Sequence, residues 1–268
     1  MPGVLFVNPR SGSGRPTVED LAAAARDRGV EVRVLESDDD LVELARRADA
    51  DVLGMAGGDG SLGAVAGVAI ERDLPFVVVP FGTRNHFARD LGLDRDDPLA
   101  ALAGFDGVER RVDTGLAGER RFLNNVSLGL YARLVHRRER HRRRREALAR
   151  LRALGILVRH PRPAHFTVDD EPVTARILLV ANNAYRLGSL TPGERERLDE
   201  GQLHLYTSSG PFRNGSWEER CADRFVVNAD GHPLRAAVDG EPDVLTTPVE
   251  FRVEPRSLRV LVPAEAAS

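Results

Sequence analysis

Two glycine-rich runs, each directly after a short β-branched apolar stretch, constrain the fold of this chain more than any other feature. Residues 51–55 (DVLGM) precede the first run, 56–62 (AGGDGSL), and residues 74–79 (LPFVVV) precede the second, 79–88 (VPFGTRNHFA). In α/β sheets, strand ends that open into glycines expose backbone N–H groups that can bind phosphate. The two runs therefore predict a parallel sheet with a phosphate-handling edge.

The first 110 residues alternate between strand and helix patterns. Strands are predicted at 4–7, 31–35, 51–55 and 74–79, and helices at 17–28, 40–48, 62–72 and 85–91. Repeated units of this length predict an α/β domain over residues 1–113, with helices on both faces of a parallel sheet.

After Asp113 the pattern changes to short extended stretches, which predict a second domain over residues 114–268. Strands are expected at 121–126, 164–168, 175–181 and 202–206, with turn signals at Asp169-Asp170 and Asp239-Gly240. This domain should be mainly antiparallel and β-sandwich-like, interrupted by a long helix over 132–158. Its last strand is free to return to the first domain.

Composition excludes several nucleotide-site chemistries. All 38 basic residues are arginine, so the chain has neither the lysine of a GxxxxGK[ST] loop nor a Schiff-base lysine. Its single cysteine, Cys221, rules out an intrachain disulfide and a cysteine-rich zinc site. With neither a signal peptide pattern nor an apolar run long enough to span a bilayer, the expected location is cytoplasmic.

Three loops carry the candidate chemistry. Residues 8–14 (NPRSGSG) end the first strand and fit either an anion-binding loop or a plain βα turn. In 57–61 (GGDGS), Asp59 is flanked by glycines, which a structural turn does not require. In the third loop, residues 80–87 (PFGTRNHF), Thr83 and Asn85 suit a phosphate site or a simple helix N-cap.

Together, and in this order, these loops resemble the catalytic domain of the diacylglycerol kinase family. That family includes bacterial lipid kinases and is kin to sphingosine kinase. Its first domain resembles NAD kinase and phosphofructokinase more distantly. In the second half, residues 122–129 (FLNNVSLG) match its F-x-N-x-x-S-x-G stretch. Residues 198–203 (LDEGQL) resemble its D-G-x-L segment, and Asp239-Gly240-Glu241 its late D-G-E.

The resemblance implies an ATP-dependent lipid kinase with Mg²⁺ and an active site between the two domains. Asp239 would be the catalytic base on the lipid hydroxyl, although Asp-Gly is also a common hairpin turn. Asp59 and Asp199 are the candidate metal ligands. The nucleotide-binding candidates are Asn8, Pro9, Ser11, Gly12, Gly57, Gly58, Asp59, Gly60, Ser61, Gly82, Thr83, Asn85 and Glu241.

The chain departs from the family pattern at several positions. Ser61 replaces a threonine, and His86 stands where the family has aspartate. Residues 182–185 (NNAY) replace a glycine-rich stretch, and an extra residue separates Asp199 from Gly201. These differences put a metal at Asp199 in doubt and leave the acceptor lipid open. An NAD kinase-like enzyme, another small-molecule kinase and a non-catalytic nucleotide- or lipid-binding homologue remain alternatives.

An arginine run over Arg137–Arg145 is the main charge feature. Residues 133–159 hold eleven arginines and two glutamates, a net charge of +9 in a chain whose total is −3. Such a helix suits docking on the anionic inner face of a membrane, where the lipid acceptor would be reached, or forms a solvated face. Nucleic acid is the least favoured partner because aromatic residues are few. A homodimer is compatible with the sequence.

Overall fold

The computed structural model describes residues 2–12, 16–129, 163–186, 193–208, 217–229 and 233–267. The chain divides into two compact units. Unit 1 comprises residues 1–114, 194–200 and 255–268, and unit 2 comprises residues 115–193 and 201–254. The predicted boundary at Asp113 lies beside the end of the first run of unit 1, which also takes two later segments.

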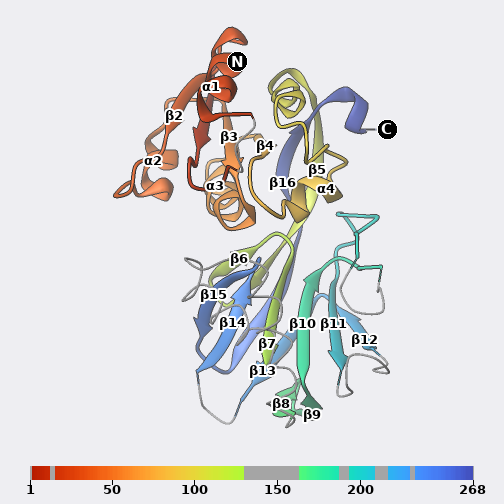
Figure 1. Cartoon of the computed structure of the whole chain (residues 1–268). Coiled ribbons are helices and arrows are strands. Elements are labelled where there is room, and N and C mark those ends of the chain that lie inside the picture. Colours follow the sequence, from red (N-terminus) through yellow and green to blue (C-terminus); the bar gives the residue numbers. More distant parts are fainter. Residues whose placement is uncertain are drawn as a thin grey trace. The chain divides into compact units, whose positions relative to one another are not determined.

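Unit 1 is an α/β unit (Figure 1). Its elements are β1 Gly3–Val7, α1 Val18–Asp27, β2 Glu31–Val34, α2 Leu41–Arg47, β3 Val52–Gly57, α3 Asp59–Glu71, β4 Phe76–Pro80, α4 His86–Asp90, η1 Ala100–Asp106 and η2 Ala264–Ala267. The strands run parallel in the order β2-β1-β3-β4, as the βα pattern predicted.

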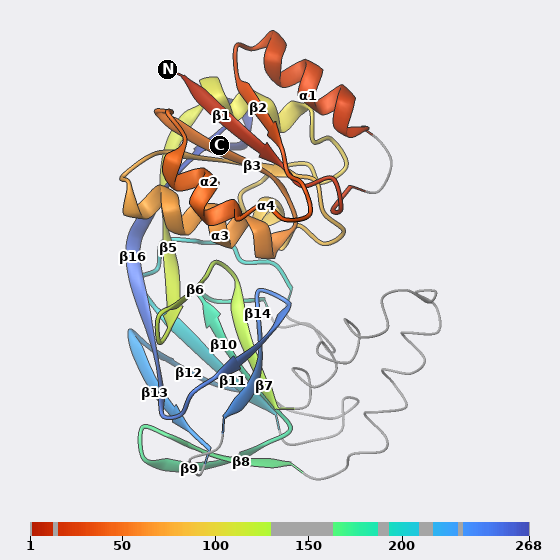
Figure 2. The same cartoon turned by 90° about the vertical axis from the view of Figure 1, so that its left-hand side faces the viewer.

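Alternation along the unit 1 strands builds two apolar faces. Leu5, Val7, Val77 and Val79 share a core cluster with α1 and η1, and Figure 2 shows α1 beside β1 and β2. Helix α3 packs against β3 and β4 and contributes nothing to that cluster. Side chains of opposite parity, such as Phe6, point to the other face.

Two strands each have residues in both units. Residues Val108–Ala117 form β5, and residues Val249–Val262 form β16. In unit 1 the last residues of β16 pair with β4 in parallel, so the last strand does return to the first unit.

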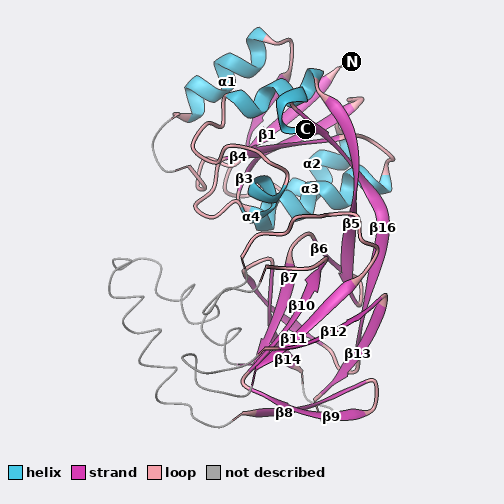
Figure 3. Ribbon diagram, turned by 90° about the vertical axis from the view of Figure 1, so that its right-hand side faces the viewer, coloured by secondary structure: helices cyan, strands magenta, loops and turns pink. Residues whose placement is uncertain are grey.

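The described part of unit 2 is almost entirely strand (Figure 3). Its strands are β6 Arg120–Phe122, β7 Asn125–Gly129, β8 Ala164–Val168, β9 Glu171–Ala175, β10 Ile177–Asn182, β11 Leu203–Ser208, β12 Glu218–Ala222, β13 Arg224–Asn228, β14 Leu234–Val238 and β15 Glu241–Leu245. The stretch predicted as one strand over 121–126 is two strands, β6 and β7. The predicted helix over 132–158 lies outside the described residues.

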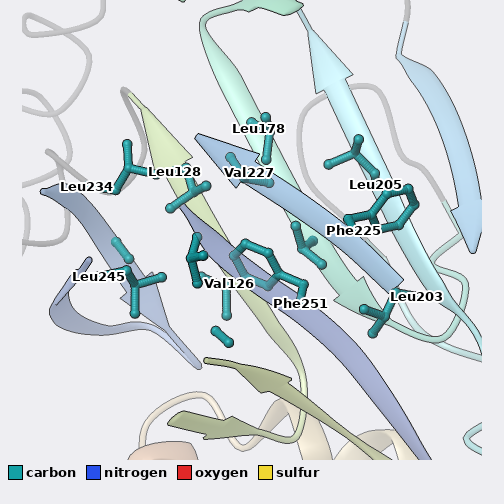
Figure 4. Packing of buried hydrophobic residues seen from close by; sticks show 14 of the residues in the cluster. Val126, Leu128, Leu178, Leu203, Leu205, Phe225, Val227, Leu234, Leu245 and Phe251 are labelled. Atoms are coloured by element: carbon teal, nitrogen blue, oxygen red, sulfur yellow. The ribbon is translucent and has the colours of Figure 1, made fainter. Parts of the chain in front are cut away.

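Two antiparallel layers enclose the core of unit 2. One sheet has the order β12-β11-β10-β7-β14-β15, and the other includes β16-β13-β8-β9. Figure 4 shows Val126 and Leu128 of β7 with Phe225 of β13 and Phe251 of β16, all in one buried cluster. Side chains from both layers fill this core, so the sandwich prediction is confirmed.

Candidate active site

The three predicted loops leave the carboxyl ends of neighbouring parallel strands. In register, Val7 of β1 lies opposite Ala56 of β3, and Gly57 of β3 lies opposite Pro80 of β4. Asn8 continues this order, because its amide donates to the Ala56 carbonyl at 2.9 Å. The loops therefore begin at one edge of the sheet, where α/β folds bind ligands.

Glycines allow these loops to contact one another closely. A Cβ at Gly12 would lie 2.7 Å from the Phe81 ring, and one at Gly82 would lie 2.6 Å from the Cα of Gly58. At Gly57 a Cβ would overlap the hydroxyl of Ser61. A Cβ at Gly58, in contrast, would meet nothing within 4 Å. The structure thus brings the loops together and leaves the surface above Gly58 open.

Helix α3 begins earlier than predicted. The sequence placed its start at residue 62, but Asp59 is its first residue and Gly58 its N-cap. The Gly58 carbonyl accepts hydrogen bonds from the amides of Ser61 and Leu62 and from the Ser61 hydroxyl at 2.9 Å. Asp59, Gly60 and Ser61 therefore form the first helical turn. Because glycine has no side chain, the N-cap makes no side-chain bond to the first N–H groups of the helix. Such N–H groups at a helix N-terminus suit an anion.

Asp59 binds the start of the next helix. Its carboxylate accepts the backbone amides of His86 at 3.2 Å and Phe87 at 3.1 Å, the first two residues of α4. The side chain is buried, so these bonds fix the second glycine loop to the third. Asp59 acts as a helix cap supplied by another segment.

Asn85 is not the simple N-cap considered from the sequence. Its backbone is left-handed, with φ 46°, and its side chain makes no capping bond. Instead Oδ1 accepts the Gly82 amide at 3.0 Å, and Nδ2 donates to the Gly82 carbonyl at 2.7 Å. Asn85 therefore closes its own loop, which leaves the capping of α4 to Asp59.

The first loop has a similar internal bond. The Asn8 side chain accepts the amide of Arg10 at 3.0 Å, and the Asn8 carbonyl accepts the amide of Ser11. Pro9 and Thr83 are exposed, and Gly12 packs under Phe81. Residues 13 and 14 of the predicted loop lie outside the described residues.

A buried ion cluster surrounds the end of α4. Asp90 Oδ1 accepts Nη2 of Arg89 at 2.7 Å, and Asp90 Oδ2 accepts Nε of Arg195 at 2.7 Å, with the Asp90 and Arg195 side chains fully buried. Burial lowers the pKa of nearby His86. Asp59 raises that pKa to a smaller degree, and Arg89 lowers it. Sequence reasoning missed Arg195, because no local pattern links it to a residue more than one hundred positions earlier.

In unit 2, Asp239 occupies a hairpin turn and also holds a neighbouring segment. Asp239 and Gly240 connect β14 to β15 with φ values of 48° and 83°, so the turn considered for Asp-Gly is present. Its carboxylate accepts three amides: Leu123 at 2.8 Å on Oδ2, and Asn124 at 2.7 Å and Asn125 at 3.1 Å on Oδ1. These are charge-assisted bonds of the stronger class.

The two other predicted acids are Glu241 and Asp199. Glu241 is exposed at the start of β15, and Asp199 forms an ion pair with Arg197 at 3.2 Å. In the part of the chain that the structure describes, no three His, Cys, Asp or Glu side chains gather as a metal site. Roles for Glu241 and Asp199 stay predictions.

Known proteins confirm the resemblance. Residues 2–117 match the diacylglycerol kinase catalytic domain. A "Probable lipid kinase YegS-like" of Pseudomonas aeruginosa is 28% identical over a gapped alignment of 297 residues. The alignment covers 97% of this chain and 94% of that protein. A Bacillus subtilis diacylglycerol kinase is 38% identical over 89 residues, 32% of this chain and 29% of that one.

A likeness in fold extends beyond the segment that the family model matches. A solved diacylglycerol kinase structure from Bacillus anthracis covers 99% of this chain and 98% of its own, with a TM-score of 0.71 at 16% identity. The predicted fold class is therefore confirmed. Within the described residues, no helix is both long and apolar enough to cross a bilayer. The Arg137–Arg145 run lies outside the described residues.

Proposed function

We propose that this chain is a kinase that transfers the γ-phosphoryl group of ATP to the hydroxyl of a lipid. The convergence of glycine loops at the carboxyl edge of the unit 1 sheet, within the segment that matches the family domain, supports the proposal most. The names of the P. aeruginosa and B. subtilis relatives favour a lipid acceptor.

The open backbone at Gly58 fits the phosphates of a nucleotide. A Cβ there would meet no atom within 4 Å, and the N-terminus of α3 presents N–H groups and the positive end of the helix dipole. Gly12 and Gly82 maintain the close packing of the flanking loops. Because the chain has no lysine, these amides, arginine and a metal ion would carry the charge compensation.

Asp59 and Asp239 have distinct proposed roles. Buried Asp59 would be one of the carboxylates that hold Mg²⁺, which needs only one or two in such sites, and the bound ion would supply charge neutralisation at the phosphates. Asp239 of unit 2 would accept the proton of the lipid hydroxyl. Phosphoryl transfer depends mostly on positioning and electrostatics, and the amides on Asp239 fix its carboxylate.

The test is ATP turnover by the full chain with Mg²⁺ and a lipid extract, with mass spectrometry of the product. We expect a lipid that gains one phosphate. Phosphorylation of NAD or a sugar phosphate in a parallel soluble-acceptor panel, with none of any lipid, would overturn the lipid assignment. ATP binding without turnover on any acceptor would favour a non-catalytic homologue.

A further inference from the structure

The segment 182–185 (NNAY) differs from the family pattern and has no role in the proposed function. It continues directly from the end of β10, and Asn182, Asn183 and Tyr185 are all buried. A buried polar segment needs hydrogen-bond partners. The partners of Asn182 and Tyr185 include residues 123–125, which connect β6 to β7 and include the first residue of β7.

Asn182 binds the carbonyl side of this β6–β7 corner, residues 123–125. Its amide donates to the Asn124 carbonyl at 3.0 Å, and its side-chain Nδ2 donates to the Leu123 carbonyl at 3.2 Å. The amides of the same three residues donate to the carboxylate of Asp239. The corner is therefore held by β10 on one side and by Asp239 on the other.

Tyr185 binds the last residue of the corner through a side chain. Asn125 Nδ2 donates to the Tyr185 hydroxyl at 3.0 Å. The backbone of Asn125 donates its amide to Asp239 Oδ1 at 3.1 Å and accepts the Asp239 amide at 2.9 Å. One residue thus separates the tyrosine hydroxyl from the carboxylate.

Tyr185 is itself fixed by packing. Its amide donates to the hydroxyl of Tyr206 at 2.9 Å, and both rings belong to a small buried cluster with Leu179 and Ala181. Trp217 contacts Tyr206 edge-to-face at 6.5 Å between ring centroids. The Tyr185 hydroxyl therefore has a defined position from which it can orient Asn125.

We infer that Tyr185 and Asn125 are positioning residues for Asp239. Their hydrogen bond fixes the corner whose amides hold the carboxylate in the orientation that receives the hydroxyl proton. The inference rests on the proposed function of Asp239. It also assigns a role to part of the segment in which this chain departs from its family.

Two variants break the same bond from opposite ends. Tyr185→Phe keeps the ring and removes the acceptor, and Asn125→Ala removes the donor. In each we expect kcat to fall about 10- to 100-fold with the KM for ATP unchanged, because a small misplacement of a reacting group costs this much. The double variant should fall no further than either single one, since the same interaction is lost. Asn228→Ala, on β13 of the other sheet, is the matched control and should keep wild-type kcat.

The effect must act through Asp239. In an Asp239→Asn background, Tyr185→Phe should leave the residual kcat unchanged. An equal fold-loss in both backgrounds, or an unchanged kcat in Tyr185→Phe, would overturn the inference.

Hydrogen exchange separates this inference from the proposed function. Tyr185→Phe should speed amide exchange at residues 123–125, where Asn125 loses its bond to the Tyr185 hydroxyl, but not in β13 of the other sheet. Unchanged exchange at 123–125 contradicts the positioning role even if the wild type phosphorylates lipid. Faster exchange in a chain without kinase activity contradicts the proposed function alone.

Discussion

Oδ1 of Asp239 lies 2.7 Å from the backbone nitrogen of Asn124, across 115 residues of sequence. This bond and those to Leu123 and Asn125 give Asp239 a structural role besides the proposed catalytic one. Replacement of this residue therefore affects both folding and turnover, and its variants need both measurements.

Asp239→Asn should lower kcat by about 10²–10⁴, the usual contribution of a general base. The new amide group would face a backbone N–H donor, so we also expect about 1–3 kcal/mol of destabilisation. Urea unfolding establishes that the variant is folded at the assay temperature. Wild-type turnover in the folded variant would remove Asp239 from the mechanism.

Two substitutions at Asp59 separate its capping role from its proposed metal role. Asp59→Ala removes both acceptor oxygens and should destabilise the protein by about 1–2 kcal/mol. Asp59→Asn keeps one acceptor oxygen but turns its amide group toward the other backbone N–H, so it should also destabilise the protein, by about 1–3 kcal/mol. Both remove the charge, so both should raise the Mg²⁺ concentration needed for half-maximal activity. If Asp59→Asn keeps the wild-type Mg²⁺ dependence, Asp59 only caps α4.

Two alanine substitutions distinguish loop packing from phosphate approach. Gly82→Ala places a Cβ 2.6 Å from Gly58 Cα and 2.8 Å from Asn85 Oδ1, so it should destabilise unit 1 by about 1–3 kcal/mol. Gly58→Ala adds a methyl group to open space and should leave thermal stability nearly unchanged. It should nevertheless raise the KM for ATP. An unchanged KM in Gly58→Ala would place the phosphates elsewhere.

His86 predicts a loss of stability in mild acid. Burial lowers its pKa from 6.5 in the folded state. As the pH falls through 6.5, the unfolded chain therefore binds a proton before the folded one does, and stability decreases until the lower folded pKa is passed. In His86→Gln, the difference in unfolding free energy between about pH 8 and about pH 5 should be smaller. An identical difference in both proteins would contradict this prediction.

Arg195→Ala should destabilise the protein by about 3–5 kcal/mol, because it removes one partner of a buried charge. Arg195 and Asp90 are fully buried, and Arg89 alone would compensate the carboxylate. Arg47→Ala breaks the exposed pair with Glu43 and should cost about 0.5 kcal/mol or less. Chemical denaturation of both variants measures the contrast. Equal losses would mean that the buried cluster adds no more than a surface pair.

The βα pattern of the first 110 residues was sufficient to predict the unit 1 sheet. Apolar stretches define β1, β3 and β4, and parallel strands connected by helices bring their carboxyl ends to one edge. Thr17 and Asp40, the N-caps of α1 and α2, also stand where local sequence signals predict helix starts. Local patterns succeed here because they depend on neighbouring residues alone.

The sequence by itself determined the two-unit fold class, the family resemblance and the glycine loops, since backbone freedom and hydrophobic periodicity are local properties. Only the tertiary structure decided which groups the polar side chains bind. Asp59 caps a helix 27 residues away, Asp90 pairs with Arg195, and Asp239 holds the corner that Tyr185 and Asn125 also fix. Such partners depend on strand order and burial, which bring distant segments into contact without leaving a periodic signal in the chain.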